Sequence, residues 1–215
     1  MEIIWLGQSC FRLRSREAVV ITDPFGPGTP GQSASLGRAT ADIVTVSHHH
    51  PDHNNAAAIG GDPHVVDGPG EYEIKGVVIT GIRTFHDAES GKVRGKNTCY
   101  LIEMDDLVIC HLGDIGHVLS TSQVEAMSSV DILLVPVGGG PTINAAQAAE
   151  VISLVEPKVV IPMHYRMPGS TSELEPVDRF LREMGVSKAE PQPKLTVSAS
   201  SLPDALEVVL LEPKA

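Results

Sequence analysis

The chain has 215 residues, 42% of them hydrophobic, and its 27 acidic and 16 basic residues give a net charge of −11. This length and apolar content suit one domain with a buried core, residues 1–215. The negative charge repels polyanions at long range, which argues against binding to extended nucleic acid. No apolar run approaches the roughly 20 residues of a membrane-spanning helix, so we expect no membrane span.

The N-terminal residues and the cysteines bear on the cellular compartment. Residues 2–6 are strand-like and lack the basic start and small-residue cleavage site of a secretory signal. Cys10, Cys99 and Cys110 form no CxxC pair, and each lies in an apolar or strand-like stretch. Reduced, buried thiols are therefore favoured over a disulfide framework. We expect a cytoplasmic protein.

The first half of the sequence is typical of a β-sheet protein. Short apolar runs separated by Gly, Pro and Asp predict strands at residues 3–6, 11–13, 18–21, 43–46, 64–66, 77–82, 98–103 and 107–110. Residues 24–37 are rich in proline and glycine and predict a loop between strands, because strand pattern resumes directly after them.

The second half alternates helices with strands. Ser120 and Gln123 form a predicted capping box, which starts a helix running to about residue 128. A strand at 132–135 follows, then a helix from Thr142 whose apolar residues recur at helical spacing. A helix at 176–184, ended by Gly185, and a closing strand at 206–211 complete the prediction. This order indicates a mixed α/β protein.

Four side chains that can bind metal follow the apolar run 43–46. His48, His50, Asp52 and His53 have the spacing HxHxDH. An extended segment places His48 and His50 on one side, and Asp52 and His53 follow on a turn, so two ligand pairs can face two adjacent ions. A solvated histidine-rich loop is the alternative interpretation.

Three later apolar runs also lead to a histidine or an aspartate. Residues 77–79 precede His86, residues 107–109 precede Asp114, and residues 159–161 precede His164. The ends of four strands can converge on one edge of a sheet. These runs therefore favour the metal-binding interpretation and predict a dinuclear site.

The order HxHxDH, lone His, Gly-Asp and Met-His-Tyr resembles the metallo-β-lactamase superfamily of hydrolases. Residues 5–11, 68–73 and 162–165 resemble a compact, Zn-dependent branch related to the ascorbate-phosphate lactonase and N-acyl-phosphatidylethanolamine phospholipase D types. The resemblance covers residues 1 to about 170. It implies an α/β fold of four layers, an αββα sandwich of two mixed β-sheets flanked by helices, with metals at one sheet edge. Gln8 departs from the pattern, which more often has His there.

The resemblance assigns three ligands to each ion and one bridging carboxylate. The first ion takes His48, His50 and His86, the second takes Asp52, His53 and His164, and Asp114 bridges them. His111 competes with His86, but it lies three residues before Asp114, and such positions on a strand face opposite sides. Asp23 either orients a ligand histidine or forms a turn before Pro24.

The His and Asp ligand set suits Zn²⁺ and tolerates Mn²⁺ or Fe, and we expect two Zn²⁺ ions. In this hypothesis a hydroxide bridging both ions attacks a small substrate that is a lactone, ester or phosphodiester. Asp52 and Asp114 are assigned catalytic roles, with Asp52 as proton acceptor. Tyr165 or His117 assists the oxyanion or leaving group, the alternative for His117 being a structural role in its loop.

Lys92, Arg94 and Lys96 alternate in the loop after His86. They either form a solvated hairpin or attract an anionic substrate. A metal-binding protein without turnover and a nuclease or short-nucleotide phosphodiesterase remain alternative functions. Iron redox enzymes of this fold typically have Glu where His50 stands and a fused flavin domain, and this chain has neither. The sequence leaves the oligomeric state open, including a homo-oligomer.

Overall fold

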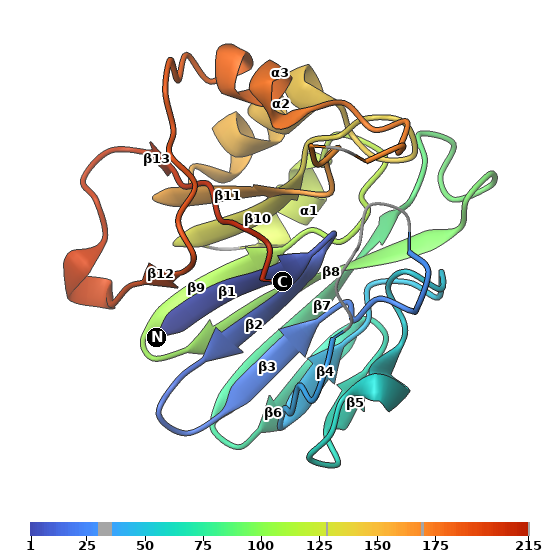
Figure 1. The fold of residues 1–215 in the computed structure, drawn as a ribbon, viewed down its shortest axis with the longest axis vertical. Helices are drawn as coiled ribbons and strands as arrows, with labels where there is room; N and C mark the ends of the chain where they lie inside the picture. The colour runs from blue at the N-terminus through green and yellow to red at the C-terminus, as the bar shows by residue number, and fades with distance from the viewer. Residues whose placement is uncertain (30–35, 128, 169, 215) are drawn as a thin grey trace.

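The computed structural model describes residues 1–29, 36–127, 129–168 and 170–214. Two mixed β-sheets face each other, and helices cover the outside of the second sheet (Figure 1). The strand order is β12-β1-β2-β3-β4-β5 in the first sheet and β13-β11-β10-β9-β8-β7-β6 in the second. The predicted α/β architecture with two mixed sheets is therefore confirmed.

The first sheet is antiparallel from β12 to β3 and parallel from β3 to β5. Its strands are β1 (Glu2–Gly7), β2 (Cys10–Arg14), β3 (Val19–Thr22), β4 (Ile43–Thr45), β5 (His64–Val66) and β12 (Leu195–Thr196).

The second sheet is antiparallel from β6 to β9 and parallel from β9 through β10 and β11 to β13. Its strands are β6 (Gly70–Ile74), β7 (Val77–Phe85), β8 (Lys96–Met104), β9 (Leu107–His111), β10 (Ile132–Pro136), β11 (Val159–Met163) and β13 (Glu207–Val208).

The α-helices of the described ranges are α1 (Thr121–Ala126), α2 (Ala145–Val155) and α3 (Val177–Glu183), and the 3₁₀ turns are η1 (Ala56–Ala58) and η2 (Ala199–Ser201). The capping box of Ser120 and Gln123 starts α1 as predicted. Helix α2 starts later than predicted, because Asn144 and Gln147 form its capping box. Helices α2 and α3 lie above β10 and β11 (Figure 1). No helix in the described ranges is long and apolar enough to cross a membrane.

The main core fills the space between the sheets and continues under α2 and α3. Trp5 and Phe11 of the first sheet belong to one buried cluster with Tyr100 and Ile102 of the second. The Tyr100 hydroxyl donates to the Val46 carbonyl at 2.8 Å, which ties β8 to the end of β4. Large buried aromatic and branched side chains of this kind supply most of the apolar burial that stabilises a sandwich.

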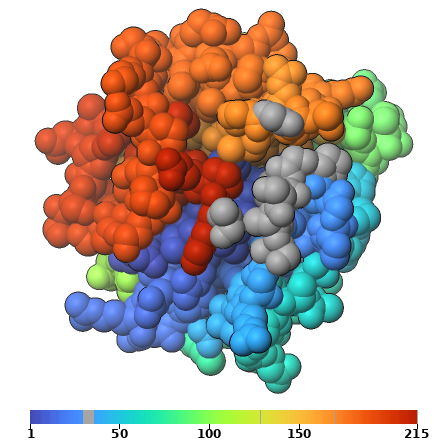
Figure 2. All heavy atoms as spheres, in the orientation of Figure 1, coloured from blue at the N-terminus to red at the C-terminus, as the bar shows by residue number. Residues whose placement is uncertain are grey.

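A smaller cluster covers the outer face of the first sheet. Cys10, Ile21 and Val44 pack there with Phe25 and Ile59, which come from loop segments. All three cysteines are buried and free, as predicted. Figure 2 shows the C-terminal segment, in red, lying over the N-terminal strands, in blue. Lys214 N donates to the Trp5 carbonyl at 2.8 Å in this contact.

The structure differs from the predicted elements at several places. Strands β6 and β12 were not predicted, and the closing strand shrinks to the two residues of β13. Of the predicted loop 24–37, residues 30–35 lie outside the described residues, and the rest contains no helix or strand. The predicted end of the first helix, residue 128, also lies outside them, and α1 ends at Ala126.

Strand directions explain where the candidate ligands gather. Strands β1, β3 and β4 run the same way in the first sheet, and β7, β9 and β11 run the same way in the second. Their carboxyl ends lead into Gln8, Asp23, His48, His86, Asp114 and His164, respectively. The topology thus brings six strand ends to one edge of the sandwich.

Candidate metal centre

Three residues at this edge have a left-handed backbone conformation, which residues other than glycine rarely adopt. The φ angles are 50° at Gln8, 38° at Asp23 and 50° at His164. Such conformations cost about 1–3 kcal/mol each and cluster at functional sites. Gln8 and Asp23 show that the strained backbone at this edge is not confined to a histidine.

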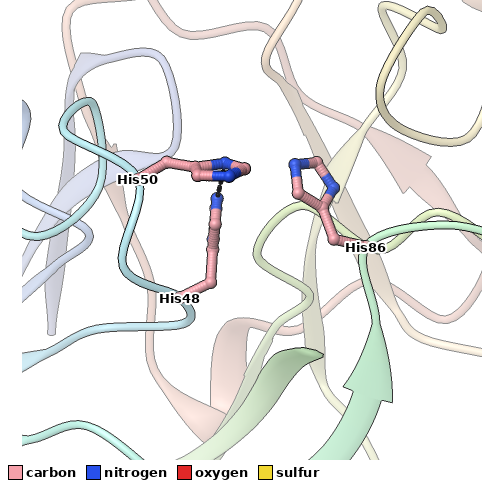
Figure 3. A group of neighbouring side chains, drawn as sticks. All are labelled: His48, His50 and His86. Carbon is pink, nitrogen blue, oxygen red and sulfur yellow. Dashed lines mark hydrogen bonds between the residues drawn. The ribbon is translucent and has the colours of Figure 1, made fainter. Parts of the chain in front are cut away.

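The first ligand group contains His48, His50 and His86, whose side chains point toward one another (Figure 3). One nitrogen of each lies within 4.8 Å of the others, and His48 Nε2 is 3.0 Å from His50 Nδ1. Burial, reinforced by nearby His53, lowers the pKa of His48 to about 3. Burial also lowers the pKa of His86. Both rings are therefore neutral at neutral pH, the form that donates a lone pair to a metal.

The second ligand group contains Asp52, His53 and His164, again with donor atoms within 4.8 Å of one another. His53 Nε2 lies 3.6 Å from Asp52 Oδ2. Burial lowers the pKa of His164. Burial alone would also lower the pKa of His53, but the carboxylates of Asp114 and Asp23 raise it well above its usual range.

Asp114 lies between the two groups. Its Oδ2 atom is 3.3 Å from His53 Nε2, 3.4 Å from His164 Nε2 and 3.7 Å from His86 Nε2. Burial opposes ionisation, but His164 and His53 outweigh it and hold the pKa of Asp114 well below its usual range. An ionised carboxylate thus contacts members of both ligand groups.

Asp23 fixes the orientation of His53, as one of its two predicted roles required. Its carboxylate accepts from Ser47 N at 2.7 Å, Ser47 Oγ at 2.5 Å and His53 Nδ1 at 2.9 Å. His53 Nδ1 therefore carries a proton, and Nε2, where the raised pKa places a second proton in the absence of a metal, is directed toward Asp114. Asp23 also falls in a third group with His48 and His53, but these hydrogen bonds already occupy its oxygens.

Gly113 and the buried Asn97 hold Asp114 in place. Gly113 has a φ of 58°, and a Cβ there would lie 2.5 Å from both Asn97 Oδ1 and the Cβ of Ser47. Asn97 Oδ1 accepts the Asp114 N–H at 3.0 Å, and Ser9 Oγ donates to Asp114 Oδ1 at 3.3 Å. Sequence reasoning missed Ser9, Ser47 and Asn97, because no spacing pattern links them to the ligands.

The donor atoms fit a divalent metal ion. Four buried ring nitrogens in the described part of the chain have no hydrogen-bond partner, namely His53 Nε2, His86 Nδ1, His164 Nδ1 and His111 Nδ1, and of these His53 Nε2 is the one that faces Asp114. Unpaired buried polar atoms are rare in folded proteins and call for a missing partner. Imidazole nitrogens with carboxylate oxygens suit Zn²⁺ and tolerate Mn²⁺ or Fe.

A pocket of about 670 Å³ opens onto both ligand groups, which we call the metal pocket. Its lining includes His50, His86, Asp52, His164 and Asp114. Gln8, Arg94 and the segments 140–141 and 171–174 form the rest of its wall. Of the three predicted loop cations, only Arg94 is among the described residues that line this pocket.

His117, Tyr165 and His111 lie outside the ligand groups. His117 Nδ1 donates to the Val118 carbonyl at 2.8 Å, and its Nε2 accepts from Phe85 N at 3.2 Å. The Tyr165 ring packs on Trp5 at 5.3 Å. Neither is among the described lining residues of the metal pocket, so their catalytic roles stay predictions, and the hydrogen bonds of His117 favour its structural alternative. His111 is buried, with Nε2 2.8 Å from the Ser9 carbonyl.

Comparisons with known proteins agree with this geometry. Residues 2–164 match the beta-lactamase superfamily domain. A UPF0173 metal-dependent hydrolase of Methanopyrus kandleri is 26% identical over 99% of this chain and 97% of its own. One of Pelotomaculum thermopropionicum is 31% identical over 77% of this chain and 84% of its own.

A solved structure from Thermotoga maritima, described as a candidate Zn-dependent hydrolase of the metallo-β-lactamase superfamily, is 38% identical. It superimposes with a TM-score of 0.81 over 98% of this chain and 97% of its own. The chain belongs to the metallo-β-lactamase superfamily, in the branch that contains the UPF0173 metal-dependent hydrolases.

Proposed function

We propose that this protein is a hydrolase that holds two divalent metal ions and cleaves a lactone, ester or phosphodiester bond in a small substrate. The observation that carries the proposal is the position of Asp114 Oδ2, 3.3 to 3.7 Å from ring nitrogens of both ligand groups. A single carboxylate in contact with two separate donor groups has the position of a bridging ligand.

The ligand assignment follows from the two groups. His48, His50 and His86 would hold one ion and Asp52, His53 and His164 the other, with Zn²⁺ as the expected metal. When bound, the ions would supply Lewis acidity toward the substrate and a water that ionises near neutral pH.

The protein supplies orientation and charge. Asp23 keeps the His53 proton on Nδ1, and Asn97 and Ser9 hold the two ends of Asp114. Asp52 is the more accessible carboxylate, since its side chain is 33% exposed and that of Asp114 is 3% exposed. Asp52 is therefore the group that we assign as proton acceptor during attack.

The size of the metal pocket supports a small substrate. Its volume of about 670 Å³ lies within the range of roughly 300–1,000 Å³ usual for small-molecule sites. The net charge of −11 opposes the approach of a long polyanion. Both observations favour a small molecule over an extended nucleic acid.

The test is hydrolysis by protein purified without an affinity tag and loaded with Zn²⁺ or Mn²⁺. The substrates are 4-nitrophenyl acetate, a γ-lactone and bis(4-nitrophenyl) phosphate. We expect turnover of at least one, lost on chelation and in Asp114→Ala, because that variant lacks the shared carboxylate. Asp131→Ala, at the opposite edge of the sheet, is the matched control and should keep activity. Turnover that survives in Asp114→Ala would contradict the assignment, and metal binding without turnover of any ester would favour the non-catalytic alternative.

A further inference from the structure

The loop after His86 has a backbone held by one carboxylate. Asp87 Oδ1 accepts the N–H groups of Glu89 and Gly91, each at 2.8 Å. Its Oδ2 accepts those of Val93 at 3.0 Å and Arg94 at 2.7 Å. Four such bonds hold the pKa of Asp87 at about 2, the bond from Arg94 N contributing most.

The two arms of this loop also approach closely. Gly91 has a φ of 80°, and a Cβ there would lie 2.9 Å from both the Gly95 carbonyl oxygen and Phe85 Cδ1. His86 N donates to the same Gly95 carbonyl at 3.0 Å. The backbone of Arg94 is therefore fixed beside a candidate ligand, and Arg94 is exposed, so both predictions for this loop, a solvated hairpin and the attraction of an anion, remain.

A second hollow of about 560 Å³, which we call the side chamber, adjoins the metal pocket. His50 and Arg94 line both, so these two side chains lie where the two hollows meet. Arg83 and Lys96 add two further cations to its wall, and Asp67 is the one carboxylate among its described lining residues. Buried Asn97 and Thr98 also line it.

The cations of the side chamber have no acidic partner among the residues that the structure describes. None of Arg83, Arg94 and Lys96 forms an ion pair with any residue in the described ranges. Unpaired cations are common in this chain, since the ion pairs in the described ranges involve four of its 16 Lys and Arg residues, but Arg83, Arg94 and Lys96 line one hollow together. Three like charges around one hollow repel each other, and an anion placed among them relieves that repulsion.

We propose that the side chamber binds a carboxylate or phosphate group of the substrate, with Arg94 as the specificity-determining residue. This inference rests on the proposed function, which supplies the bond that is hydrolysed, and it narrows the class of substrate. The substrate class becomes an ester, lactone or phosphodiester that carries a separate anionic group. Arg94 can grip such a group with paired N–H donors, a geometry that a lysine cannot reproduce. Lys92 lines neither hollow, which separates it from the other cations of the loop.

The experiment is calorimetric titration of the metal-loaded protein with succinate, inorganic phosphate and succinamide, the last being a neutral analogue of succinate. We expect succinate or phosphate to bind and succinamide not to bind. In Arg94→Ala the Kd of the bound anion should rise about tenfold or more, as expected for a charge-assisted hydrogen bond. Arg94→Lys should recover part of the loss. Lys92→Ala, which removes the same charge from the same loop, should stay within about twofold because only screened, long-range attraction is lost.

Three results would overturn the proposal: no binding of either anion, an unchanged Kd in Arg94→Ala, or an equal loss in Lys92→Ala. Metal content measured on the same samples separates this test from that of the proposed function. A protein without metal contradicts the hydrolase assignment whatever the anion affinities are. A metal-loaded, active protein with equal anion affinity in all variants contradicts only the side-chamber proposal.

Discussion

Replacing Asp23 with Asn probes how the protein prepares a histidine for metal binding. The carboxylate accepts hydrogen bonds from Ser47 N, Ser47 Oγ and His53 Nδ1. An asparagine keeps one acceptor oxygen. Its NH₂ group replaces the other oxygen and faces a hydrogen-bond donor in place of an acceptor. Asp23 and His53 are each 0% exposed, so water cannot replace the lost partner. A hydrogen bond to a charged group contributes about 1.5–3 kcal/mol, and we expect the unfolding free energy of the metal-free protein to fall by that amount.

The same substitution should weaken metal binding. If the His53 proton moves to Nε2, that nitrogen no longer offers a lone pair to the ion. Loss of such a supporting group typically lowers metal affinity about 10- to 100-fold. Competition with a chromophoric chelator measures the affinity, and urea denaturation measures the stability. Asp131→Asn is the control, because Asp131 accepts a backbone N–H from Val108 at 2.8 Å far from the ligands. Wild-type affinity for both ions in Asp23→Asn would refute the reasoning.

Two further predictions concern the loops that carry the site. Gly113→Ala adds a Cβ 2.5 Å from Asn97 Oδ1 at a φ of 58°, and strain plus overpacking should lower the unfolding free energy by about 2–4 kcal/mol; an unchanged urea midpoint would contradict this. Asp87 has a pKa lowered to about 2 from an ordinary value of about 3.9, so its contribution to stability is complete above about pH 4 and is lost as the pH falls toward 2. The amide hydrogens of Gly91 and Arg94 should therefore lose their protection from exchange over that pH interval in the wild type. In Asp87→Ala that protection should be low already at neutral pH. Equal protection in both proteins would show that the carboxylate does not hold the loop.

The fold and the candidate ligands follow from local patterns in the sequence. His48, His86, Asp114 and His164 each come after an apolar run, and such runs form strands whose ends share an edge when the strands run the same way. The order of the candidate ligands along the chain was enough to assign them to two groups, because the family pattern fixes that order.

The residues around the ligands depend on contacts between distant segments. Asp23 and Ser47 are 24 residues apart, and Ser9 reaches Asp114 across 105 residues, so no periodicity relates them. The side chamber needs Arg83 of β7 and Arg94 of the following loop around one hollow, and contacts such as the hydrogen bond from Arg94 N to Asp87 hold that loop. Strand β6 was missed because its burial is weak and Gly70 begins it.

The most direct test of the two-metal assignment is elemental analysis of protein purified without a chelator or an affinity tag, for the wild type and for Asp114→Ala. We predict near two equivalents of Zn, Mn or Fe in the wild type and fewer in the variant, since Asp114 contacts both ligand groups. A wild type that stays empty after reconstitution, or an Asp114→Ala variant that keeps both ions, would contradict the dinuclear centre.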